Sequence, residues 1–315
     1  MEKKKTIPIF QGDICDFPSS EELPQGVKTV ELKDTFGYPF RFIPEVVYSG
    51  RSGETQKLHL LLPYVPCDWN DSEKVFPLIV FIQGSAWHRQ QVFEHMPHMV
   101  RICQQGYAVA MVEYRPSELA PFPAQIHDAK AAVRFMRMNA EKYNVDSQKI
   151  ALWGDSSGGH TVVMAGITAD CELDTELYKE FSCKVQCIID WYGPTDISKM
   201  NDVLSSQNHI EPDSPEGYLI GRKNVLENLD LVAPTIPMNY LSADKEIPPI
   251  MIMHGSRDDL VNFNQSCLLY NKLKELDKEV EMYKLEGATH GAGGFNSEEA
   301  VMLVSDFLAK HLKVK

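Results

Sequence analysis

The sequence predicts an α/β protein with a mostly parallel central sheet and helices on both faces. Short apolar, β-branched runs alternate along the chain with longer segments whose apolar residues recur at helical spacing. A strand buried on both faces of a parallel sheet is apolar throughout, and the run from Phe76 to Ile82 is of that kind. At 315 residues the chain has the length of a large α/β domain.

Each element is justified by its local pattern. The predicted strands are apolar runs bounded by turn residues, and they cover residues 46–48, 57–62, 76–82, 107–112, 149–153, 185–191, 249–253 and 280–285. The predicted helices place apolar residues on one face, as Ile126, Ala129 and Val133 do. They cover residues 92–105, 123–143, 159–166, 264–276 and 297–312.

Two segments do not follow the alternation. Residues 1–45 carry scattered Pro, Gly and charge, and are predicted as an irregular N-terminal extension ahead of a folded domain at 46–315. Residues 196–246 are polar, rich in Asn, Ser and Pro, and too long for a simple crossover. We therefore expect them to form a cap-like insertion over the active site.

Composition excludes several classes of protein. The formal net charge of −13 argues against nucleic acid or an anionic membrane as a partner. No apolar run is long enough to span a membrane, and the first residues lack the apolar stretch of a signal peptide. We expect a cytoplasmic protein, or an exported one whose signal has been removed. The sequence leaves the oligomeric state open, and a homodimer is among the states it allows.

The chain has an odd number of cysteines, seven, and they are scattered along it: Cys15, Cys67, Cys103, Cys171, Cys183, Cys187 and Cys267. This distribution favours reduced thiols over a disulfide framework. It contains no C-x-x-C pair and no Cys/His cluster of the kind that binds zinc. We expect no metal and no cofactor.

The segment Gly154-Asp155-Ser156-Ser157-Gly158 follows a predicted strand and precedes a predicted helix. A serine on such a sharp turn adopts a strained backbone that exposes its hydroxyl, and its neighbours two residues away must be small. The adjoining helix N-terminus offers free N–H groups to a developing negative charge. Ser156 is thus the candidate nucleophile, although G-x-S-x-G alone also occurs in turns without chemistry.

A serine nucleophile needs a base and an acid that orients it. Asp258 follows the predicted strand at 249–253, and His290 follows the one at 280–285. Nucleophile, acid and histidine follow each other in this order in α/β-hydrolases, each at the carboxyl end of a strand. His290 is the candidate base and Asp258 the candidate acid, with Asp259 its close rival.

The oxyanion of the reaction needs two donors. One candidate is the backbone N–H of Ser157, and the other lies in the loop after the strand at 76–82, which begins Gln83-Gly84-Ser85-Ala86. We expect the Ser85 N–H, with Gly84 second. Trp87, Trp191 and Tyr192 stand at predicted strand ends, where an aromatic ring stacks on a substrate or simply packs in the core.

These motifs, together with the segments FIQGSAW, WYGPTD and GATHG, resemble the α/β-hydrolase esterases of the hormone-sensitive-lipase-like branch. More closely, the chain is similar to bacterial bifunctional feruloyl and acetylxylan esterases. The resemblance covers about residues 46–315. It implies an α/β-hydrolase fold, hydrolysis of acetyl and feruloyl esters on xylan fragments, and a Ser156, Asp258 and His290 triad. The Gln-Gly-Ser loop departs from the His-Gly-Gly pattern of the wider lipase group.

The sequence therefore predicts a serine carboxylesterase that acts on a small-molecule or oligosaccharide ester. A general short-chain esterase, and an amidase or peptidase of the same fold, are the alternatives within enzymes. A binding protein that has lost its activity is the alternative outside them, but such proteins usually lack a triad member and none is missing here. The polar insertion at 196–246 favours hydroxyl-rich substrates over long-chain lipids.

Overall fold

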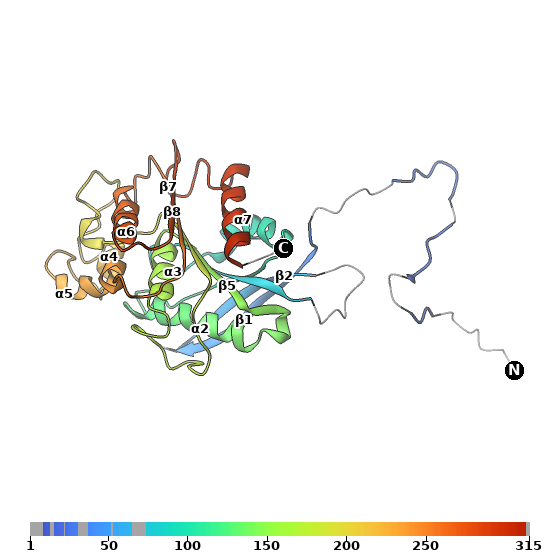
Figure 1. Cartoon of the computed structure of the whole chain (residues 1–315), viewed down its shortest axis with the longest axis horizontal. Helices are drawn as coiled ribbons and strands as arrows, with labels where there is room; N and C mark the ends of the chain where they lie inside the picture. Colours follow the sequence, from blue (N-terminus) through green and yellow to red (C-terminus); the bar gives the residue numbers. More distant parts are fainter. Residues whose placement is uncertain are drawn as a thin grey trace.

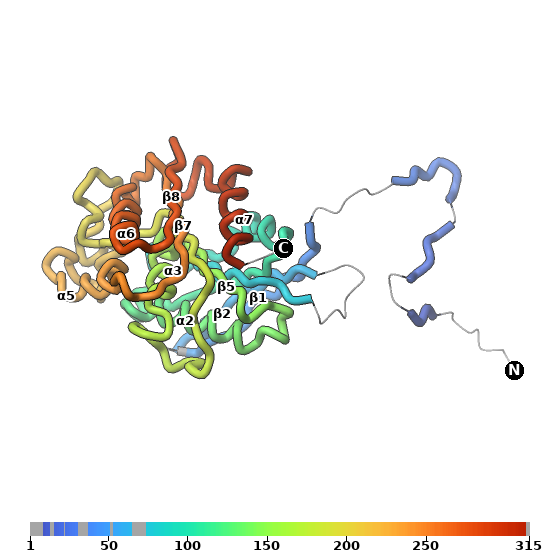
Figure 2. The backbone as a smooth tube through the Cα atoms, in the orientation of Figure 1, coloured from blue at the N-terminus to red at the C-terminus, as the bar shows by residue number. Residues whose placement is uncertain are grey.

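The computed structural model describes residues 9–12, 16–21, 23–30, 37–51, 53–64 and 74–312. Cys15, Cys67 and much of the predicted extension lie outside these residues. The described residues before Phe40 contain no strand and no α-helix, and residues 9–30 among them are drawn apart from the sheet (Figure 2). Tyr38, in contrast, packs against Phe76 of the third strand. No helix in the described ranges is both long and apolar enough to cross a membrane.

The described residues form one eight-stranded sheet in the order β1-β2-β4-β3-β5-β6-β7-β8 (Figure 1). β1 and β2 pair antiparallel, β2 pairs antiparallel with β4, and all later pairs are parallel. The strands are β1 (Phe40–Arg51), β2 (Glu54–Pro63), β3 (Phe76–Ile82), β4 (Ala108–Val112), β5 (Val145–Asp155), β6 (Cys187–Trp191), β7 (Ile250–Gly255) and β8 (Val280–Leu285).

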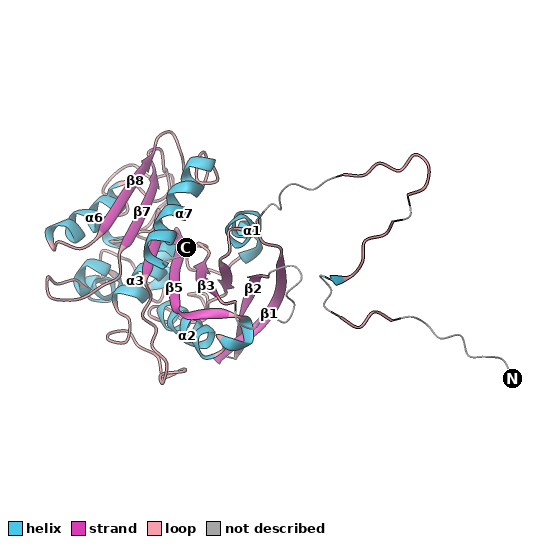
Figure 3. Ribbon diagram, turned by 45° about the vertical axis from the view of Figure 1, so that its right-hand side comes forward, coloured by secondary structure: helices cyan, strands magenta, loops and turns pink. Residues whose placement is uncertain are grey.

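Helices cover both faces of the sheet (Figure 3). They are α1 (Met96–Gln104), α2 (Ala124–Met138), α3 (Ser157–Ile167), α6 (Asn264–Glu275) and α7 (Glu298–Leu312). Residues of α2, α3 and α6 share one hydrophobic core with Leu78 and Val80 of β3. Residues of α1 and α7 share a second core with Ile79 and Phe81 of the same strand. Alternate side chains of one strand thus fill two cores, which is why the run is apolar throughout.

The boundaries differ from the prediction where the chain departs from regular pairing. β1 begins at Phe40 rather than at residue 46, inside the segment predicted as an extension. Its register with β2 shifts between Ile43 and Val46, and Glu45 has a φ of 57°. The intervening Pro44 is tolerated because β1 is an edge strand, and a bulge there hides the alternation. The helix predicted at 92–105 begins with a 3₁₀ turn, Val92–His95, before α1.

The segment predicted as an insertion folds into short helical pieces. These are η4 (Ile197–Lys199), α4 (Pro215–Leu219), α5 (Leu229–Val232), η5 (Ala233–Thr235) and η6 (Pro237–Tyr240). Ile197, Leu219, Val225 and Val232 pack in a small core of their own around Trp87. The segment also exposes apolar side chains, namely Val203, Leu204, Leu226, Leu229 and Leu231. It is therefore less uniformly polar at its surface than the sequence suggested.

Candidate active site

Ser156 lies on the sharp turn between β5 and α3. Its backbone has φ 50° and ψ −127°, a conformation that L-residues rarely adopt, so the prediction of a strained turn is confirmed. A Cβ added at Gly154 would lie 2.3 Å from the Gly158 oxygen. A Cβ added at Gly158 would lie 2.0 Å from the Ile82 oxygen. Only glycine fits either position, because two strands and a helix meet there.

The structure brings the three candidate catalytic residues into one chain of hydrogen bonds. His290 Nε2 lies 2.9 Å from Ser156 Oγ, and His290 Nδ1 lies 2.8 Å from Asp258 Oδ2. A carboxylate only accepts, so Nδ1–H donates to Asp258 and Nε2 is left to accept the serine proton. Asp258 follows β7 and His290 follows β8, and their side chains are 0% and 19% exposed.

The environment of Asp258 keeps it ionised. Burial raises its pKa, but hydrogen bonds from His254 and His290 outweigh that effect and lower the pKa to about 2. Its other oxygen, Oδ1, accepts the N–H groups of Leu260 and Val261 at 3.0 and 2.9 Å. Asp259, the rival acid, is an exposed residue.

The loop after β3 departs from the predicted oxyanion hole. The Ser85 N–H donates to Ser157 Oγ at 2.9 Å, and the Gly84 N–H donates to Asp155 Oδ1 at 3.0 Å. Both amides are thus engaged, which disagrees with our assignment of Ser85 or Gly84 as the donor. The N–H groups of Ala86 and Ser157 have no acceptor among the described residues, and both residues line the cavity at Ser156. Ala86 replaces Ser85 as the candidate donor beside Ser157.

A buried hydroxyl cluster fixes that loop. Tyr114 Oη lies 2.9 Å from Ser85 Oγ and 3.3 Å from Ser157 Oγ. Ser85 Oγ also donates to the His88 carbonyl at 2.7 Å. Burial raises the pKa of Tyr114 to about 12, so its hydroxyl keeps its proton. Sequence reasoning missed Tyr114 and Ala86, because nothing local marks a residue whose role is set by the loop's folded path.

The three aromatic candidates are all buried, at 1–2% exposure. Tyr192 lines the cavity and meets the His290 ring edge to face at 4.7 Å. Trp87 also lines it, while its Nε1–H donates to His160 Nδ1 at 3.3 Å. Trp191 is absent from the cavity wall and packs against Trp153 at 4.9 Å. The prediction that Trp191 contacts substrate disagrees with this placement, because the ring is enclosed in the core.

The cavity at Ser156 has a volume of about 340 Å³. Its wall on the side of the insertion includes Gln207, His209, Pro215 and Glu216, so this part of the 196–246 segment does reach the site. Glu94, His95 and Asp155 belong to the same wall. Within the described ranges, no group of three or more His, Cys, Asp or Glu side chains is arranged to hold a metal ion.

A parallel sheet covered on both faces, with a serine on the strand-to-helix turn and a histidine and an aspartate after later strands, defines the α/β-hydrolase fold. Within that class the chain belongs to the BD-FAE family, which it matches over residues 64–273. This family match confirms the predicted resemblance of the motifs to α/β-hydrolase esterases.

Three relatives illustrate the similarity. The chain is 27% identical to Esterase LipC of Mycobacterium tuberculosis over 69% of its own length and 53% of LipC. It resembles a truncated carbohydrate esterase from gut microbiota, with a TM-score of 0.76, 28% identity and coverage of 89% of this chain and 99% of that one. It also resembles the bifunctional GH43-CE protein of Bacteroides eggerthii, with a TM-score of 0.72, 29% identity and coverage of 86% of this chain and 38% of that one. The chain spans about half the length of the curated relatives it matches.

Proposed function

We propose that this protein is a serine carboxylesterase that hydrolyses acetyl or feruloyl esters of xylan-derived sugars. The observation that carries the proposal is the hydrogen-bonded chain from Ser156 through His290 to Asp258, at the edge of an open cavity. An imidazole within 2.9 Å of a strained serine hydroxyl is the arrangement that nucleophilic acyl transfer requires.

In the proposed mechanism each step belongs to a particular residue. Ser156 Oγ attacks the ester carbonyl while His290 Nε2 takes its proton. The N–H groups of Ser157 and Ala86 receive the oxyanion of the tetrahedral intermediate. His290 then protonates the departing alcohol, and water repeats the sequence on the acyl-enzyme. Asp258 holds the imidazole in the required tautomer and stabilises the imidazolium that forms.

The sugar-ester part of the proposal is supported by the relatives whose names describe carbohydrate esterases, and by the polar groups that the insertion adds to the cavity. The volume of about 340 Å³ suits a small acyl group or one aromatic acyl group better than a long lipid chain. The exposed Leu204 and its apolar neighbours lie on the same segment and favour the lipid alternative, so acyl length must be tested.

The test is a panel of esters with the wild type, Ser156→Ala and His290→Ala. Acetyl, butyryl, feruloyl and palmitoyl esters of 4-nitrophenol are compared by kcat/KM, beside release of acetate and ferulate from xylo-oligosaccharides. We expect hydrolysis of short and feruloyl esters, little of palmitoyl, and a loss in kcat of about 10⁴-fold or more in either variant. Near-normal turnover by Ser156→Ala would refute the mechanism, and palmitoyl turnover at or above acetyl would refute the substrate class.

A further inference from the structure

The insertion places a buried histidine–carboxylate pair on the wall of the catalytic cavity. His209 and Glu216 have side chains only 4% and 3% exposed, and His209 Nδ1 lies 2.8 Å from Glu216 Oε1. The other carboxylate oxygen, Glu216 Oε2, is buried and has no hydrogen-bond partner among the described residues. Both residues line the cavity that also contains Ser156 and His290.

We infer that Glu216 Oε2 is the acceptor of a substrate-binding subsite that takes a hydrogen bond from a hydroxyl group of the substrate. The inference rests on the proposed function, because it assigns a specificity-determining residue to that esterase. Burying a carboxylate oxygen without a hydrogen-bond donor costs free energy, and a ligand that supplies the donor removes this penalty. A substrate that lacks the hydroxyl leaves the penalty in place, so the site binds it less well than a substrate that has the hydroxyl.

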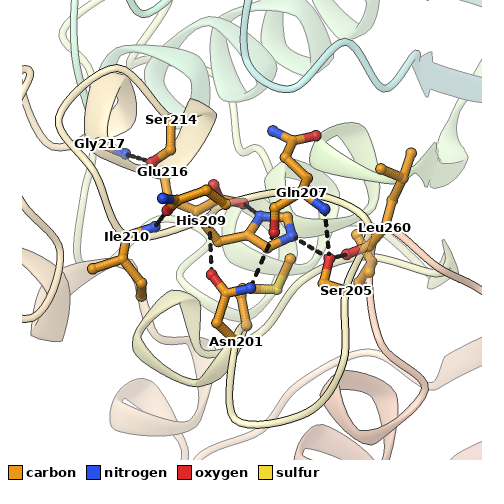
Figure 4. A network of polar contacts seen from close by, with 12 residues as sticks. Asn201, Ser205, Gln207, His209, Ile210, Ser214, Glu216, Gly217 and Leu260 are labelled. Carbon is orange, nitrogen blue, oxygen red and sulfur yellow. Dashed lines mark hydrogen bonds and ion pairs between the residues drawn. The ribbon is translucent and has the colours of Figure 1, made fainter.

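The pair is held in place by the loop that carries the catalytic acid (Figure 4). His209 Nε2 lies 3.0 Å from Ser205 Oγ, which in turn lies 3.1 and 3.2 Å from the carbonyls of Asp259 and Leu260. The His209 N–H donates to Asn201 Oδ1 at 2.8 Å. The imidazole is thus fixed at both ends and by its backbone, and it fixes Glu216 relative to the residues that follow Asp258.

Glu216 has one occupied and one free carboxylate oxygen. His209 Nδ1 lies against Oε1, whereas Oε2 has no partner among the described residues. A carboxylate oxygen accepts hydrogen bonds, so a ligand group that donates one, such as a hydroxyl, suits Oε2.

Two parts of a feruloylated or acetylated sugar carry such a group: the sugar alcohol and the phenolic ring of the acyl group. Two pairs of substrates separate them. Methyl ferulate is compared with methyl 3,4-dimethoxycinnamate, and an acetylated methyl xyloside with its O-methylated counterpart. Each pair keeps the oxygen and replaces its proton with a methyl group, and the Glu216 variants below distinguish loss of the donor from the added bulk. In the wild type we expect at least one pair to differ by about 10- to 100-fold in kcat/KM in favour of the hydroxyl. The substrate pair whose two kcat/KM values differ shows whether the hydroxyl comes from the sugar or from the acyl group.

Two substitutions then assign the effect to Glu216. Glu216→Met removes the acceptor, and Glu216→Gln keeps a partner for His209 while it puts an amide in place of Oε2. Both should shrink the ratio within the responding pair to within about threefold. Glu211→Gln, an exposed carboxylate of the same segment, should leave the ratio unchanged. Glu216→Gln keeps the test valid if Glu216→Met does not fold.

The outcomes separate this inference from the proposed function. If the wild type hydrolyses all four esters with both ratios near one, or if both Glu216 variants keep the wild-type ratio, the subsite is refuted while the esterase stands. If no ester is hydrolysed, or if turnover survives in Ser156→Ala, the proposed function itself fails and the subsite with it.

Discussion

Replacing Asp258 with Asn should lower kcat far more than the same change at Asp259. In Asp258→Asn the amide oxygen still accepts the N–H groups that Oδ1 accepts now, so the amide nitrogen takes the place of Oδ2, 2.8 Å from His290 Nδ1. Two donors then face each other unless the imidazole changes tautomer. The new tautomer carries its proton on Nε2, toward Ser156, and is unable to accept the serine proton. Loss of the correct tautomer costs about 10⁴-fold in kcat.

The neighbouring variant is the matched control. Asp259 is exposed, and the contacts of its carbonyl with Ser205 and Ser206 survive a side-chain change. Asp259→Asn should therefore stay within about twofold of wild type. The assay is kcat and KM for 4-nitrophenyl acetate at mildly alkaline pH, with circular dichroism to verify folding. Equal losses in the two variants, or a larger loss at Asp259, would refute the assignment of the acid.

Further predictions concern the oxyanion loop and stability against pH. Ser157→Ala removes the acceptor of the Ser85 N–H, so kcat should fall about three- to tenfold with KM unchanged, and unchanged kcat would contradict the role of that bond. Burial raises the pKa of Asp190 to about 7, partly offset by the Gly193 N–H. The folded state then keeps a proton that the unfolded state releases above about pH 4, so Asp190 should reduce stability by about 1.4 kcal/mol per pH unit up to about pH 7. Urea unfolding of Asp190→Asn should lack this slope, and an identical slope in both proteins would contradict it. Asp258 has the opposite sign: its lowered pKa, about 2, supplies stability at neutral pH that is lost as the pH falls from about 4 toward 2.

The fold was largely predictable because the buried strands are short apolar runs bounded by turn residues. β8 has the predicted limits, Val280–Leu285, and β3 has the predicted limits, Phe76–Ile82. β1 was predicted too short because a bulge at Pro44 and Glu45 interrupts the two-residue alternation while the pairing continues. Local patterns report side-chain periodicity, and backbone pairing across a bulge leaves no such pattern.

The catalytic residues were predictable because each one directly follows a strand. Ser156, Asp258 and His290 each follow a strand, and parallel strands end at one edge of the sheet. The donors of the loop after β3 were misassigned, because the Ser157 hydroxyl that engages the Ser85 amide comes from another strand end. Glu216 was missed because it stands in an irregular segment, where only the folded path shows that it reaches the cavity.

The central claim is that Ser156 forms a covalent acyl-enzyme with help from His290. Mass spectrometry of the protein quenched during turnover of 4-nitrophenyl acetate tests it most directly. We expect the wild type, which retains His290, to accumulate a species with one added acetyl group on the peptide that carries Ser156. Ser156→Ala should carry no added acetyl group. An acetyl group on another residue, or ester turnover by Ser156→Ala at the wild-type rate, would contradict it.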